Sequence, residues 1–110
     1  MSFTAIPREG AIVVRIDEDR VDITTAPQLK AELKKLLESG VNALIVDFTS
    51  VRFVDSSGLG VLLSALRIAA RTGSTVRVAG LRPEVLTIFE LAQMHRVLDI
   101  FPTEREALAS

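Results

Sequence analysis

Val54-Asp55-Ser56-Ser57-Gly58-Leu59-Gly60 is the stretch of this sequence that decides the fold. The apolar run at residues 43–46 before it is typical of a buried strand, and residues 61–70 after it have the composition of a helix. The stretch therefore predicts a strand-to-helix junction that presents hydroxyls and backbone N–H groups. Such a helix N-terminus can bind an anion, and a phosphate in particular.

Upstream of the junction, β-branched residues at 3–6 and 11–16 predict an antiparallel hairpin, with residues 7–10 as its turn. Residues 17–22 are polar and predict a loop. A helix is expected to follow, with Thr25 as its cap and Pro27 in its first turn. It should end at Gly40, and its spacing predicts one core-facing stripe of Leu29, Leu33, Leu36 and Leu37.

Downstream of the first helix, strands are expected at residues 41–48, 75–79 and 98–101. The junction helix should close at Gly73 with a left-handed cap. Pro83 is expected to open a third helix, and Thr103 a short fourth one through a capping box with Glu106. The residues expected to face inward are Leu59, Leu62, Leu63, Leu66 and Ala70 in the junction helix, and Val85, Ile88, Phe89 and Ala92 in the third.

This alternation of strands and helices predicts an α/β fold. Helical crossovers join parallel strands, and the N-terminal hairpin supplies an antiparallel pair. We therefore expect residues 1–110 to form a single domain with a mixed, mostly parallel sheet of about five strands and four helices.

Composition excludes several classes of function. The sequence has no cysteine, so thiolate metal sites and disulfides are impossible. No apolar run approaches the roughly 20 residues of a membrane span, and no signal peptide is evident. Net charge is −1, there is no Tyr or Trp, and the five Phe are expected in the core, which argues against nucleic-acid binding. The expected location is the cytoplasm, with no membrane contact.

Catalysis is not expected, and no cofactor or metal is predicted. The single histidine, His95, has no partnered nucleophile motif and is expected to be structural or on the surface. Ser57 does not lie in G-x-S-x-G, because position 55 is Asp, and Leu63 replaces the third glycine of a dinucleotide motif. Asp47 lacks the neighbouring acids that would hold Mg²⁺.

The hydroxyls of the junction allow a structural and a functional interpretation. Asp and Ser are both favoured N-caps. Ser56 is expected to be the cap, which leaves Ser57 pointing outward. The two interpretations are compatible.

Residues 47–62, DFTSVRFVDSSGLGVL, resemble the central motif of the STAS domain family, the anti-sigma factor antagonists. Val21-Asp22 followed by Thr24-Thr25-Ala26 is similar to that family's first loop, and Pro83-Glu84-Val85 and the C-terminal segment also fit. One departure is Asp19, where the family loop usually has Gly. Asp tolerates the left-handed backbone conformation better than most residues do. The shape of the loop, and hence the partner that it fits, depends on this position.

The resemblance implies a partner-switching protein with a phosphorylation site at Ser57. The unphosphorylated form would bind an anti-sigma factor that is also a serine kinase and free a sigma factor, and a PP2C-type phosphatase would reset the phosphorylated form. The partner-binding residues implied by the motif are Asp22, Thr24, Asp55, Ser56, Ser57, Gly58, Leu59 and Gly60. The alternative is a structural STAS subunit of a stress-signalling or lipid-transport complex, never phosphorylated.

Overall fold

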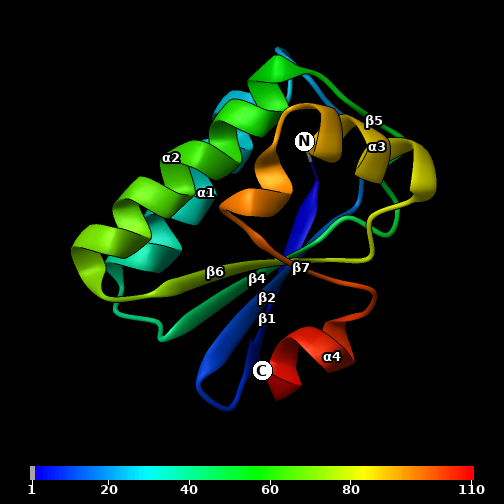
Figure 1. Ribbon diagram of the computed structural model, residues 1–110. Helices are drawn as coiled ribbons and strands as arrows, with labels where there is room; N and C mark the ends of the chain where they lie inside the picture. The colour runs from blue at the N-terminus through cyan, green and yellow to red at the C-terminus, as the bar shows by residue number, and fades with distance from the viewer. Residues whose placement is uncertain (1) are drawn as a thin grey trace.

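The computed structural model describes residues 2–110, in which seven strands and four α-helices alternate along the chain (Figure 1). In order, the elements are β1 (Phe3–Arg8), β2 (Ala11–Ile16), β3 (Arg20–Val21), α1 (Ala26–Glu38), β4 (Ala43–Asp47), β5 (Phe53–Val54), α2 (Ser56–Thr72), β6 (Thr75–Ala79), α3 (Pro83–Leu91), the 3₁₀ turn η1 (Met94–Arg96), β7 (Asp99–Phe101) and α4 (Glu104–Ala109).

Five strands form the main sheet in the order β1-β2-β4-β6-β7. Only the β1–β2 pair is antiparallel, because the other neighbours are joined by crossovers that contain helices. The predicted mixed, mostly parallel five-stranded sheet with four helices is therefore confirmed. Strands β3 and β5 form a separate two-stranded parallel pair.

The two faces of the main sheet are covered unequally by helices (Figure 1). Helices α1 and α2 lie side by side over one face, and the larger core cluster lies beneath them. The short helix α4 covers the other face, where Ala107 packs on small residues of the strands. Strand β4 is buried along its whole length, which explains its unbroken apolar sequence.

Two strand predictions need correction. Strand β1 does not stop at Pro7 but continues through Arg8, because β1 is an edge strand and tolerates a residue without an N–H. The predicted loop at residues 17–22 contains β3. Local patterning does not reveal this strand, since its partner Phe53–Val54 is more than thirty residues away.

Several residues expected to face inward are exposed. In α2 the buried stripe consists of Gly58, Val61, Leu62, Ser64, Ala65, Ile68 and Ala69. Small residues let α2 pack against both the sheet and α1, and this rotates Leu63 and Ala70 toward solvent. Ala92 lies past the end of α3 and is exposed, and Phe53 is 40% exposed. No helix within residues 2–110 has the length and apolar character needed to cross a membrane.

Candidate functional site

The start of α2 is capped by Asp55, not by Ser56 as the sequence predicts. The Asp55 carboxylate accepts hydrogen bonds from the backbone N–H groups of Ser57 at 2.9 Å and Gly58 at 3.2 Å. These two donors are therefore unavailable to an outside anion, contrary to the expectation that the junction's N–H groups face outward. Ser57 lies in the first helical turn, as predicted, and is half-buried, whereas Ser56 is exposed.

The first loop is fixed against this junction by backbone hydrogen bonds. The carbonyl oxygen of Asp19 accepts from the N–H groups of Arg52 at 2.7 Å and Phe53 at 3.1 Å. The Arg20 guanidinium lies 4.6 Å from the centre of the Phe53 ring. Asp19 does not need the left-handed conformation, since Gln93 is the only non-glycine residue in the described part of the chain with positive φ. The turn therefore forms without the family's glycine.

Asp22 shapes the turn that leads into α1. Its carboxylate accepts from the N–H of Thr24 at 3.0 Å and from the Thr24 hydroxyl at 2.6 Å, and Arg20 donates to it at 3.3 Å. These bonds lower the pKa of Asp22 to about 2. Thr25 occupies the N-cap position of α1, as predicted, but its hydroxyl accepts from the Asp22 N–H at 2.9 Å and makes no capping bond to the start of the helix. The Asp22 side chain therefore stabilises the conformation of its own loop through hydrogen bonds to Arg20 and Thr24.

We expect Asp22→Asn to lower the melting temperature at pH 7, because an amide accepts these hydrogen bonds less strongly than a carboxylate. The depressed pKa contributes stability above the ordinary carboxyl pKa of roughly 4, and this contribution is lost as pH falls through about 2. The gap between wild type and variant should therefore narrow between pH 4 and pH 2. Thermal unfolding at several pH values tests this, with the exposed Asp99→Asn as the control; a gap independent of pH contradicts it.

A groove of about 420 Å³ runs between the first loop, α1 and the start of α2, and we call it the Ser57 groove. Its lining is mostly apolar, and Ile23, which is 73% exposed, stands at its rim. The lining residues are Ile23, Ala26, Pro27, Lys30, Ser57, Gly60 and Val61. An exposed apolar side chain beside a groove favours contact with another protein.

The predicted site residues divide into four groups around this groove. Ser57 and Gly60 line it. Asp22, Asp55 and Thr24 hold its backbone, and Ser56 is exposed outside it. Gly58 is buried against β3 and Leu59 packs on the core, so these two residues position the helix.

The sequence analysis missed Ile23, Pro27 and Lys30. Ile23 carried a signal, since it is an aliphatic residue with polar neighbours on both sides, Asp22 and Thr24.

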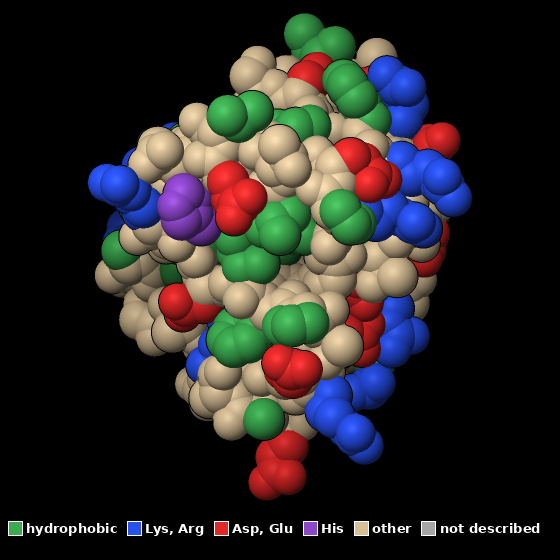
Figure 2. Space-filling model, turned by 45° about the vertical axis from the view of Figure 1, so that its right-hand side comes forward, with side chains coloured by type: hydrophobic (Ala, Val, Ile, Leu, Met, Phe, Trp, Pro, Cys, Tyr) green, Lys and Arg blue, Asp and Glu red, His purple; other side chains and the backbone are tan. Residues whose placement is uncertain are grey.

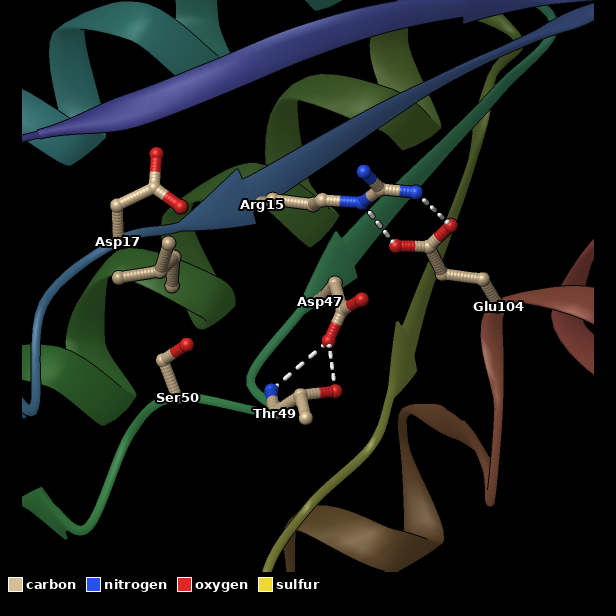
Figure 3. Close-up of a pocket in the computed structure, with 7 residues that line it drawn as sticks. Arg15, Asp17, Asp47, Thr49, Ser50 and Glu104 are labelled. Carbon is tan, nitrogen blue, oxygen red and sulfur yellow. Dashed lines mark hydrogen bonds and ion pairs between the residues drawn. The ribbon is translucent and has the colours of Figure 1, made fainter.

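A second hollow, of about 360 Å³, lies at the carboxyl ends of β2 and β4 (Figure 3). Arg15 makes a two-pronged ion pair with Glu104, at 2.6 and 2.9 Å, and so ties α4 to the sheet. The buried Asp47 accepts from the N–H of Thr49 at 2.8 Å. Burial, and then the neighbouring Glu104, raise the pKa of Asp47, while Arg15 lowers the pKa of Glu104 to about 2. These charged groups partner one another, which indicates a structural role in holding α4.

Because its pKa is raised in the folded state, ionised Asp47 reduces stability at neutral pH, and that cost disappears as pH falls below about 4. We expect Asp47→Asn to raise the melting temperature at pH 7, since the amide keeps the acceptor for Thr49 and offers Glu104 a donor. The gain should vanish near pH 3. Asp17→Asn, in the same hollow but exposed, should show no such gain. A lower melting temperature for Asp47→Asn at pH 7 contradicts this.

A third hollow, of about 330 Å³, is apolar and lies between α3 and the edge strand β7. Figure 2, which turns this side forward, shows hydrophobic side chains gathered in the middle of the face with acidic ones among them. His95 is exposed, in line with its expected surface position.

Fold and site together define a small α/β domain with a mostly apolar groove beside the capped start of α2. The sequence profile of the STAS domain matches residues 3–107, and the chain belongs to the STAS domain family.

Curated relatives of this chain include anti-sigma-B factor antagonists. That of Listeria monocytogenes is 29% identical over 86 residues, covering 78% of this chain and 75% of the relative. That of Bacillus subtilis is 26% identical over 80 residues, covering 73% and 72%.

Solved structures confirm the fold. An anti-sigma factor antagonist from Mycobacterium paratuberculosis superposes with a TM-score of 0.89 at 22% identity, covering 98% of this chain and 91% of that one. The anti-sigma factor antagonist SpoIIAA in its unphosphorylated form gives 0.75 at 22% identity, covering 98% and 96%.

Proposed function

We propose that this protein is an anti-sigma factor antagonist whose unphosphorylated form binds an anti-sigma factor and thereby frees a sigma factor. In this proposal the anti-sigma factor is also a serine kinase, phosphorylation of Ser57 ends the complex, and a PP2C-type phosphatase restores it. The chain is then the substrate of the kinase and a binding partner. The names of its relatives and its membership of the STAS domain family support this function.

The observation that carries the proposal is the position of Ser57 in the Ser57 groove. Its hydroxyl makes no hydrogen bond to any other residue of the described chain, so it is available for phosphoryl transfer. The exposed Ile23 and the apolar lining beside it give a partner surface to bury. Ser56, the preceding residue in the sequence, does not line the Ser57 groove.

Two measurements test the proposal together. The chain is purified from its native cell with its bound proteins, and its intact mass is measured. We expect a bound anti-sigma factor, and, after incubation with that kinase and ATP, one added phosphoryl group that peptide mapping places on Ser57. Ser57→Ala should remain bound whether or not ATP is present. A phosphate on Ser56, or a bound partner with no kinase activity and no phosphate, contradicts the proposal and favours a structural subunit.

A further inference from the structure

A second groove lies along the seam between α1 and α2, and it is basic. It encloses about 320 Å³ and is lined by Lys30, Lys34, Ser64, Arg67, Ile68 and Arg71; we call it the basic groove. The two lysines lie on α1 and the two arginines on α2, each pair one helical turn apart, or roughly 6 Å along its axis. Two rows of cations therefore line one channel, to which no carboxylate contributes a lining side chain within residues 2–110.

These cations are largely without internal counter-charges. Arg71 pairs with Glu38 at 3.3 Å. Lys30, Lys34 and Arg67 have no ion pair with any residue from 2 to 110. The whole chain has a net charge of −1, so this local excess does not follow from composition. Neighbouring like charges repel, and an anionic ligand would remove that repulsion.

A serine hydroxyl lies among these cations. Ser64 is 9% exposed, lines the basic groove, and makes no hydrogen bond to the rest of the described chain. By contrast, the hydroxyl of Thr72 on the same helix donates to the carbonyl oxygen of Ile68 at 3.1 Å. No buried polar side-chain atom within residues 2–110 lacks a hydrogen-bond partner, so the unbonded hydroxyl of Ser64 is open to the groove. Ser64 thus offers a donor to an acceptor oxygen that the chain itself does not supply.

The basic groove and the Ser57 groove adjoin, because Lys30 lines both. We propose that an acidic segment of the protein partner lies in the basic groove, with carboxylates against Lys34 and Arg67 and an acceptor oxygen at Ser64. This inference rests on the proposed function, which it extends from the Ser57 groove along α1 and α2. The two rows of cations and the adjacent Ser57 groove favour a protein segment over a free anion, because a segment can contact several of these positions at once and a small anion only one.

The test uses the whole chain and a defined probe, an acetylated and amidated hexaglutamate peptide, followed by backbone NMR. We expect shifts at the residues of the basic groove, weakening as salt is added. Lys34→Glu with Arg67→Glu should lower the affinity about tenfold or more. Lys35→Glu with Arg96→Glu makes the same change of net charge outside the groove and should have little effect. The neutral pair Lys34→Gln with Arg67→Gln repeats the test without charge reversal.

Each other outcome overturns the inference. Equal losses in the groove and control variants would show a nonspecific charge effect. Inorganic phosphate that saturates the groove more tightly than the peptide would show a small-anion site, and preferential binding to phosphatidylglycerol vesicles would show a lipid surface. The proposed function fails if no anti-sigma factor is captured or if Ser57 is never phosphorylated. That failure is distinguishable from failure of this inference, because the peptide titration needs neither the anti-sigma factor nor the phosphate.

Discussion

Gly58→Ala is expected to destabilise the domain although it adds a better helix former. A Cβ at position 58 would lie 2.8 Å from the carbonyl oxygen of Val21 and 2.8 Å from a methyl carbon of Val54. Both atoms belong to the β3–β5 pair beneath α2, so helix or strands must shift. Overpacking of this kind costs about 1–3 kcal/mol, and alanine's higher helix propensity returns about 1 kcal/mol. We expect a net loss of up to about 2 kcal/mol, a fall in melting temperature of up to roughly 10 °C.

Gly60→Ala is the matched control, since it lies two residues further along the same helix. A Cβ there meets nothing within 4 Å. The variant should gain up to about 1 kcal/mol, so the two alanine variants should differ in denaturant unfolding by the overpacking cost of about 1–3 kcal/mol. If both gain equally, α2 does not pack closely on β3. Since Gly60 lines the Ser57 groove, its variant should also bind the partner more weakly while being more stable.

The sequence predicts the strand–helix alternation well because those signals are local. The apolar run of β4, the stripe of α1 and the left-handed cap at Gly73 depend on neighbouring residues in the chain, and the structure confirms all three. Features that depend on contacts between distant segments are the ones that fail. Strand β3 exists only because Phe53–Val54 lies beside it, and Leu63 is exposed because α1 occupies one side of α2.

The details of the site follow the same rule. Asp55, Ser56 and Ser57 are all good caps by residue type, and only the backbone path out of β5 makes Asp55 the one that caps. The Ser57 groove joins Ile23 to Gly60 across more than thirty residues. The basic groove likewise appears in the sequence as two separate i, i+4 pairs, and only the packing of α1 on α2 brings them together.

Phosphorylation of Ser57 is expected to weaken partner binding by about 100-fold or more without unfolding the domain. The phosphate adds about −1.5 to −2 charges at pH 7. Asp55 already occupies the Ser57 and Gly58 N–H groups, so the phosphate gains little from the helix start and lies close to that carboxylate. In the free domain water screens this repulsion. In the complex the phosphate must lose water inside a mostly apolar groove in which Lys30 is the one lining cation among residues 2–110. A phosphate charge that this single lysine does not balance costs several kcal/mol to bury, whereas about 2.7 kcal/mol already gives 100-fold.

This mechanism is tested by comparing the phosphorylated and unmodified chains by backbone NMR and by titration with the captured anti-sigma factor. Binding should be lost while chemical shifts change only around the start of α2 and the first loop. Ser57→Asp should reproduce part of the loss, and Ser56→Asp, one residue away but outside the Ser57 groove, should cost far less. Helix α2 packs on both the sheet and α1. We therefore expect the phosphate to leave the position of α2 unchanged. Shifts spread through β4, β6 and α3 would instead show that phosphorylation acts by a change of conformation.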